Sequence, residues 1–106
     1  MSASGPGPNS PLPAGETRRT VQVDNDRVRV TEWRFGPGAA TGHHVHAHDY
    51  VVVPLTEGRL KQLLPDGSEM FSDLVPGQSY SRNAGVEHDV VNANPHEFAF
   101  VEIELK

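Results

Sequence analysis

The sequence predicts an all-β domain that closes into a small double-sheet barrel. From Val21 onward, short β-prone runs are separated by clusters of Gly, Pro, Asn and Asp, and no longer window has a helical period. So many short strands in one open sheet would leave one face and two edges exposed to solvent. We therefore expect two packed sheets or a closed barrel.

The first four expected strands cover residues 20–23, 28–35, 43–55 and 59–64. Turn-type clusters separate them: Asp-Asn-Asp at 24–26, Gly-Pro-Gly at 36–38 and Glu-Gly at 57–58.

The last four expected strands cover residues 69–72, 78–81, 87–92 and 97–105. The turns that delimit them are 65–67, 76–77, 84–85 and 94–95. The segment 64–68, Leu-Pro-Asp-Gly-Ser, is the best hairpin candidate.

The length of 106 residues indicates one domain. Residues 1–16 are rich in Gly and Pro and contain little that a core could bury, so we expect a disordered N-terminal arm, followed by a folded domain over 17–106. With 36% hydrophobic residues, one Trp and four Phe, the core is modest. A partner subunit would help, and we expect a homodimer.

Composition argues against several classes of partner. Fourteen acidic and nine basic residues give a net charge of −5, so no nucleic-acid partner is expected. No apolar run approaches the roughly 20 residues of a membrane span, and no signal peptide is evident, so we expect a cytoplasmic protein without a membrane partner. Cysteine is absent, which restricts any metal site to nitrogen and oxygen ligands.

Four histidines lie within the six residues 43–48. In a strand, side chains two residues apart share one face, so His44, His46 and His48 can present three imidazoles to one point. This spacing predicts a metal site.

Two segments resemble the two motifs of the cupin family. Segment 38–58 resembles the first motif: Gly38, five residues, His44-Val45-His46 and a closing Gly58. Segment 77–92 resembles the second motif at each fixed position except Asn83, where proline is usual. The resemblance implies an antiparallel double-stranded β-helix, also called a jelly-roll or cupin barrel. It also implies an internal metal ion held by His44, His46 and His88.

The chemistry of the spacing agrees with this resemblance. Imidazoles from positions i and i+2 can converge on a metal about 2 Å from each nitrogen, and a third His from a neighbouring strand leaves other coordination positions open.

The chain departs from the first motif at its usual glutamate, because Tyr50 or Val51 stands at that position. Water can fill the gap beside a three-His site, His48 can be a fourth ligand, or Tyr50 can point its hydroxyl at the metal or the substrate. A phenol with a pKa near 10 is a poor ligand, so we rank the three-His site first, His48 second and Tyr50 as a hydrogen-bonding residue of the pocket. Asp49 has the opposite parity and is expected to face outward.

A neutral three-His shell would leave a divalent ion with its full charge, which favours anionic substrates. Three-His iron sites of the cupin family include thiol dioxygenases, so the resemblance implies an Fe(II)-dependent dioxygenase acting on a small anionic metabolite. Zn, Ni, Mn or Cu are alternatives, since such donors discriminate poorly among these metals. The alternative function is a non-catalytic module that binds a metal and a small ligand.

Other side chains are expected to have supporting roles. Arg82, Arg34 and Gln62 are candidates to hold a substrate carboxylate, and we select Arg82 together with Tyr50 as candidate catalytic residues. Five residues are expected outside the site. The histidines His43 and His96 are expected in turns or facing solvent. The aromatics Trp33 and Tyr80 are expected in the core or an interface, and Asn92 is expected to satisfy backbone groups.

Segments 49–58, 85–94 and 97–105 also look like a subgroup of small bacterial cupins named beta-alanine degradation proteins. This resemblance implies a role in the metabolism of amino acids or small carboxylates.

Overall fold

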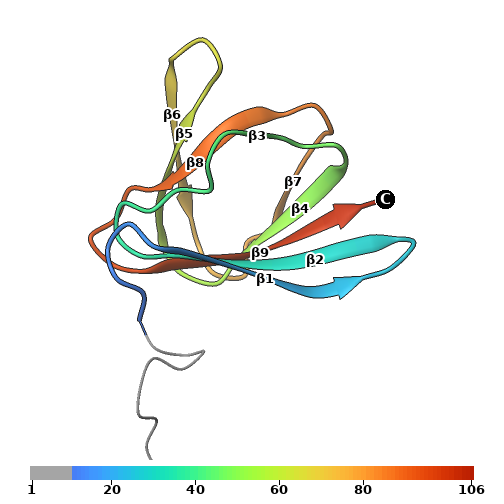
Figure 1. Ribbon diagram of the computed structural model, residues 1–106, viewed down its shortest axis with the longest axis horizontal. Helices are drawn as coiled ribbons and strands as arrows, with labels where there is room; N and C mark the ends of the chain where they lie inside the picture. Colours follow the sequence, from blue (N-terminus) through green and yellow to red (C-terminus); the bar gives the residue numbers. More distant parts are fainter. Residues whose placement is uncertain (1–10) are drawn as a thin grey trace, which may run out of the picture.

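The computed structural model describes residues 11–106 as two antiparallel β-sheets that face each other (Figure 1). The strands are β1 (Thr17–Asp24), β2 (Val28–Phe35), β3 (His44–Val45), β4 (Asp49–Pro54), β5 (Gly58–Leu63), β6 (Glu69–Leu74), β7 (Tyr80–Arg82), β8 (Glu87–Asn92) and β9 (Phe98–Leu105). The larger sheet has the order β1-β2-β9-β4-β7, and the smaller has the order β3-β8-β5-β6. Apart from the hairpins β1-β2 and β5-β6, successive strands lie in different sheets, as in a double-stranded β-helix, and the predicted all-β fold is confirmed.

One predicted element is wrong in detail. The run 43–55 forms two strands, β3 and β4, in different sheets, because the chain bends at residues 47 and 48. Before the bend, the backbone N–H of His46 donates to Val86 O at 2.9 Å, and His46 O accepts from Gly85 N–H at 2.8 Å. The sequence 43–55 has no turn cluster at this point, so its residue types do not indicate the break between the two strands.

The expected N-terminal arm lies partly outside the described residues, since the structure describes nothing before Pro11. Its described part contacts the barrel: Leu12 is buried, and its backbone N–H donates to Glu97 Oε1 at 2.7 Å. Gly36 N–H donates to Glu16 O at 2.8 Å, and a Cβ at Gly36 would collide with Pro13 O. Contacts with the barrel therefore extend to residues before Thr17.

Alternation along the strands places one set of side chains between the sheets. Phe98 and Phe100 on β9 point inward, and they meet Leu60 from β5 and Phe35 from β2. Phe35 and Phe98 have no exposed surface. This apolar cluster fills one part of the barrel and forms the floor of the site described next.

None of the described residues belongs to a helix long and apolar enough to cross a membrane.

Candidate metal centre

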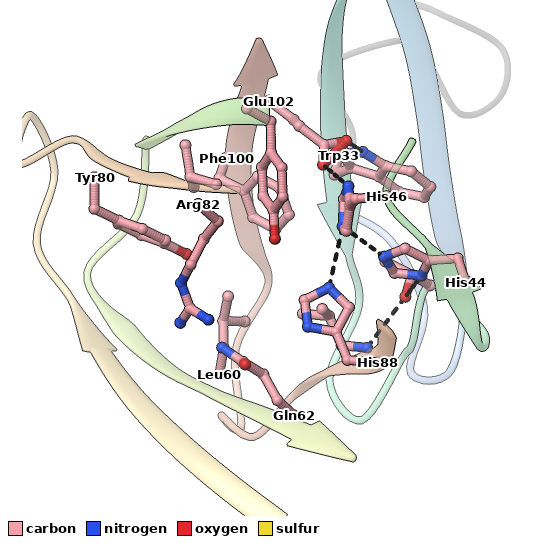
Figure 2. Close-up of a pocket in the computed structure, with 14 residues that line it drawn as sticks. Trp33, His44, His46, Leu60, Gln62, Tyr80, Arg82, His88, Phe100 and Glu102 are labelled. Atoms are coloured by element: carbon pink, nitrogen blue, oxygen red, sulfur yellow. Dashed lines mark hydrogen bonds and ion pairs between the residues drawn. The ribbon is translucent and has the colours of Figure 1, made fainter. Parts of the chain in front are cut away.

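A cavity between the two sheets has the three motif histidines in its wall (Figure 2). The centre of a water-sized sphere can occupy a volume of about 60 Å³ inside it. One water needs roughly 10–15 Å³ by this measure, so the space suits a few waters or a ligand of a few non-hydrogen atoms. The polar residues of the wall are Thr41, His44, His46, Tyr50, Gln62, Tyr80, Arg82, His88 and Glu102.

The Nε2 atoms of the three histidines converge. His44 lies on β3, opposite His88 on β8, and His46 follows directly after β3. The Nε2 atom of His46 is 3.0 Å from that of His44 and 3.1 Å from that of His88. Two imidazole nitrogens bound at right angles to one ion, each about 2.1 Å from it, are about 3.0 Å apart. These two separations fit ligands of one metal ion, and the ligand atoms of all three histidines lie within 4.8 Å of one another.

The other ring nitrogen of His44 determines its tautomer. Nδ1 lies 2.8 Å from Gly42 O, a carbonyl that only accepts, so we assign the proton to Nδ1. The Nε2 atom of His44 then presents a lone pair to the cavity. A neutral imidazole with a free nitrogen is the form that binds a metal.

Burial keeps two of the histidines neutral. It lowers the pKa of both His46 and His88 to about 4, with further lowering from the neighbouring His44 and from Arg82. At neutral pH both rings are therefore ready to bind a metal without first losing a proton. The Nδ1 atom of His88 is buried and has no hydrogen-bond partner.

Tyr50 packs flat against His46, with ring centroids 3.8 Å apart and an angle of 16° between the planes. Burial raises the pKa of Tyr50 to about 12, so the side chain stays a neutral phenol. A phenol that is hard to ionise is a poor metal ligand and a suitable hydrogen-bond donor.

Arg82 on β7 also lies in the wall, and Figure 2 shows its side chain extending toward Leu60 and Gln62. Its guanidinium carbon is 5.8 Å from the centre of the Tyr80 ring. None of the ion pairs formed by residues 11–106 includes Arg82. The cavity thus contains a cation whose charge is available to an anion.

With this geometry established, similar proteins indicate the family. Beta-alanine degradation protein BauB of Pseudomonas aeruginosa is 62% identical over 87 residues, which are 82% of this chain and 90% of that protein. The crystal structure of a cupin domain from Bordetella pertussis Tohama I is 53% identical, with a TM-score of 0.83 over 90% of this chain and 98% of that chain. The chain belongs to the BauB family of small cupins.

A more distant structure shows the same fold. A cupin superfamily protein from Desulfitobacterium hafniense DCB-2 is 18% identical, with a TM-score of 0.69 over 99% of this chain and 94% of that chain. No protein-family model matches the chain.

The structure does not bring His48 to the other histidines of this BauB-family cupin. Among residues 11–106, the group whose ligand atoms lie within 4.8 Å of one another contains only His44, His46 and His88. The parity argument for His48 required one continuous strand, and the bend after His46 breaks it. His48 instead borders a second cavity of about 360 Å³, which His44 and His46 also line. His44 and His46 therefore border both cavities.

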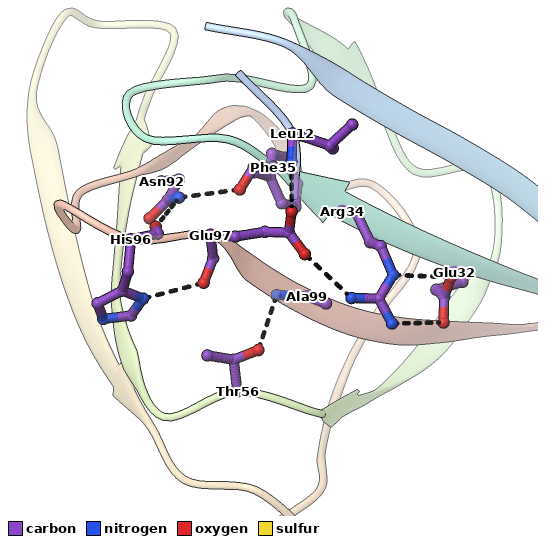
Figure 3. Close-up of polar contacts among 9 residues, drawn as sticks. All are labelled: Leu12, Glu32, Arg34, Phe35, Thr56, Asn92, His96, Glu97 and Ala99. Atoms are coloured by element: carbon purple, nitrogen blue, oxygen red, sulfur yellow. Dashed lines mark hydrogen bonds and ion pairs between the residues drawn. The ribbon is translucent and has the colours of Figure 1, made fainter. Parts of the chain in front are cut away.

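The other expected residues divide between the cavity and the surface. Gln62, Trp33 and Tyr80 line the cavity, whereas Arg34 pairs with Glu32 and Glu97, each at 3.2 Å, away from it (Figure 3). His43 is exposed and pairs with Glu87, Asp49 and His96 are exposed, and Asn92 donates to backbone carbonyls. His43, His96, Asp49 and Asn92 lie as expected, whereas Trp33 and Tyr80, expected outside the site, line the cavity and Arg34 lies away from it.

Sequence reasoning missed Glu102 on β9. This carboxylate is 8% exposed, and its Oε2 lies 3.6 Å from His46 Nδ1. Its Oε1 accepts a hydrogen bond from Trp33 Nε1 at 3.3 Å. Burial raises the pKa of Glu102. Glu102 shares the inward face of β9 with Phe98 and Phe100, but alternation alone could place it inward only once that face was known to be internal.

Proposed function

We propose that this cupin binds a divalent metal ion, with Fe(II) favoured, at His44, His46 and His88, and that it oxidises a small anionic metabolite with dioxygen. The observation that carries the proposal is the convergence of three Nε2 atoms, with separations of 3.0 and 3.1 Å from His46 to its two neighbours. A bound Fe(II) ion would supply the oxygen chemistry, and Zn, Ni, Mn and Cu suit the same donors.

Arg82 supports a small carboxylate as the substrate class. Its charge has no carboxylate partner among the described residues, and the guanidinium can form two parallel hydrogen bonds to a carboxylate. The neutral phenol of Tyr50 can donate one more hydrogen bond in the same cavity. The name of the Pseudomonas relative, a beta-alanine degradation protein, agrees with a small carboxylate as substrate.

The apolar part of the wall assists these polar groups. Val52, Leu60 and Phe100 border the cavity and are at most 5% exposed, so this part of the wall is shielded from bulk water. In such a low-dielectric space, the attraction between Arg82 and an anion is stronger than in water. The volume of about 60 Å³ restricts the ligand to a few non-hydrogen atoms.

The test uses protein purified without a histidine tag. Elemental analysis identifies the bound metal, and protein loaded anaerobically with Fe(II) is then mixed with oxygenated buffer and a panel of small carboxylates, thiols and amines. We expect oxygen consumption that depends on one of these compounds, that His88→Ala abolishes and that His43→Ala leaves unchanged. His43 is the matched control because it is exposed and outside the cavity.

Two outcomes would contradict this function. Wild-type protein that binds none of these metals would exclude it altogether. Protein that retains metal and a carboxylate tightly but consumes no oxygen would establish the alternative, a non-catalytic binding module.

A further inference from the structure

Glu102 reaches the metal centre from the larger sheet. Its strand, β9, belongs to the five-stranded sheet, whereas His44 and His88 lie in the other sheet. Figure 2 shows the Glu102 carboxylate beside His46 and Trp33. The carboxylate is not one of the metal-ligand group, which among residues 11–106 consists of three histidine nitrogens within 4.8 Å of one another. Glu102 must therefore act on the metal site through a neighbouring residue.

We propose that Glu102 is a positioning residue, which holds His46 in the tautomer that leaves Nε2 free for a metal ion. This role of Glu102 rests on the proposed metal site, but the tautomer of His46 can be measured in protein without any metal. The contacts of the two oxygens with Trp33 and His46 carry the argument.

A buried carboxylate requires donors, because an ionised group without partners is very unfavourable away from water. Trp33 Nε1 donates to Oε1 at 3.3 Å. Oε2 faces His46 Nδ1 at 3.6 Å, slightly longer than a hydrogen bond. With its proton on Nδ1, His46 completes the environment of the carboxylate. With its proton on Nε2, the Nδ1 lone pair would face the carboxylate and repel it.

The opposite end of the His46 ring competes with this assignment when no metal ion is bound. His44 carries its proton on Nδ1, toward Gly42 O, so its Nε2 offers a lone pair only 3.0 Å from His46 Nε2. A proton on His46 Nε2 would satisfy that contact but would occupy the nitrogen that a metal needs. Glu102 favours the other tautomer and so leaves two lone pairs facing each other, an arrangement that a cation between them stabilises.

Tyr50 and Glu102 together fix the orientation of the ring. Tyr50 stacks on the face of His46 with centroids 3.8 Å apart, and Glu102 lies at its Nδ1 edge. A carboxylate that orients a metal-binding histidine through its second nitrogen is a common arrangement, and its removal typically lowers metal affinity about 10- to 100-fold. In this chain Tyr50 or Val51 stands at the position of the usual cupin glutamate, and the carboxylate of Glu102 lies beside His46 from another strand.

The first test is the tautomer in metal-free protein. Nitrogen-15 chemical shifts of the imidazole rings, measured by NMR at pH 7, distinguish a proton on Nδ1 from one on Nε2. We expect His46 to carry the proton on Nδ1 in the wild type and in Glu102→Gln, whose amide oxygen still accepts. In Glu102→Leu we expect a shift toward Nε2. A proton on Nε2 in the wild type, or an unchanged tautomer in Glu102→Leu, would overturn the proposal.

The second test is Zn²⁺ affinity, measured by competition with a chelator. We expect a loss of about 10- to 100-fold in Glu102→Leu and a smaller loss in Glu102→Gln. Glu104→Gln is the matched control, since Glu104 lies two residues along β9 and pairs with Arg29 at 3.7 Å. Wild-type affinity in Glu102→Leu, or in Glu102→Gln if the leucine variant does not fold, would contradict the role. If the wild type binds no Zn²⁺, the proposed function fails, and the tautomer comparison still decides the role of Glu102.

Discussion

The Nε2 atoms of His46 and His88 lie 3.1 Å apart, although 42 residues separate the two histidines in the chain. Pairing between β3 and β8, which sets His44 opposite His88, brings the two segments together. An unfolded chain has no such preformed site, so metal binding and folding of the barrel must be coupled.

We predict that Zn²⁺ stabilises the wild type and not the His88→Ala variant. A ligand that binds only the folded state at 100 times its dissociation constant adds about 2.7 kcal/mol to the free energy of unfolding. Urea denaturation with and without Zn²⁺ measures this difference. His43→Ala should retain the full effect, because His43 is exposed and pairs with Glu87. Equal stabilisation of the wild type and His88→Ala would contradict the site.

Much of the fold was predictable because strands and turns are local. The alternation of apolar residues and the Gly, Pro and Asn clusters located most strands within a few residues of their observed ends. The division of 43–55 was not predictable in this way. It depends on backbone hydrogen bonds between His46 and residues 85 and 86, which belong to a distant part of the chain.

The candidate site was predictable where it follows a motif and not where it depends on the path of the chain. His44, His46 and His88 occur at motif spacings and do converge. His48 was selected on strand parity, which the bend removes. Glu102 was missed because Val101 and Ile103, on the opposite face of β9, are also apolar, so the sequence did not show which face is internal.

The metal-free protein should lose stability on acidification from pH 6.5 to 4. The pKa of His46 and His88 is about 4 in the fold, against about 6.5 in the unfolded chain. In this window the unfolded chain binds more protons, so the free energy of unfolding falls as pH falls. The slope is at most about 1.4 kcal/mol per pH unit for each histidine. Above pH 6.5 both states leave these rings neutral, and the effect vanishes.

Urea denaturation at pH 7, 6 and 5 measures this dependence. In the double variant His46→Gln, His88→Gln, the free energy of unfolding should depend less on pH. Only the two imidazole rings are removed, and all other titratable groups remain in place. Parallel profiles for the wild type and the double variant would refute the assignment to these histidines.

Arg82 should determine affinity for a small carboxylate. In Zn²⁺-loaded protein, we expect Arg82→Lys to weaken binding about 10-fold and Arg82→Ala more, because lysine cannot form the paired hydrogen bonds of a guanidinium. Calorimetric titration with the carboxylate that binds the wild type best measures the change. Arg34→Lys is the control, since Arg34 pairs with Glu32 and Glu97 outside the cavity. Unchanged affinity in Arg82→Ala would exclude Arg82 from the binding site.

Asn92 should be important for stability rather than for chemistry. It is 1% exposed, and its Nδ2 lies 3.1 Å from Phe35 O and 2.8 Å from His96 O (Figure 3). Asn92→Ala leaves these carbonyls without their donor and should cost about 2–3 kcal/mol. Thermal and urea unfolding measure the loss, and Asn83→Ala, at an exposed position, should have little effect. A cost below about 0.5 kcal/mol for Asn92→Ala would contradict this role.

An apolar row crosses the outer face of the larger sheet. Val30 on β2 and Val51 on β4 both pair with Ile103 on β9, between them. Their neighbours Thr31, Glu102 and Val52 are buried inside the barrel, so alternation directs the row outward. The three side chains of the row are half-buried, and an apolar sheet face of this kind favours association with an equivalent face, which a two-fold axis provides.

We therefore predict a homodimer through this face. Light scattering at micromolar concentration should give a dimeric mass for the wild type and a monomeric mass for Ile103→Glu, since two buried carboxylates would face each other across the axis. Met70→Glu is the control: Met70 is a 45% exposed hydrophobic residue on β6 of the other sheet, so its substitution should leave the dimer intact. A monomeric wild type would exclude the dimer, and a dimeric Ile103→Glu variant would place the interface on another surface.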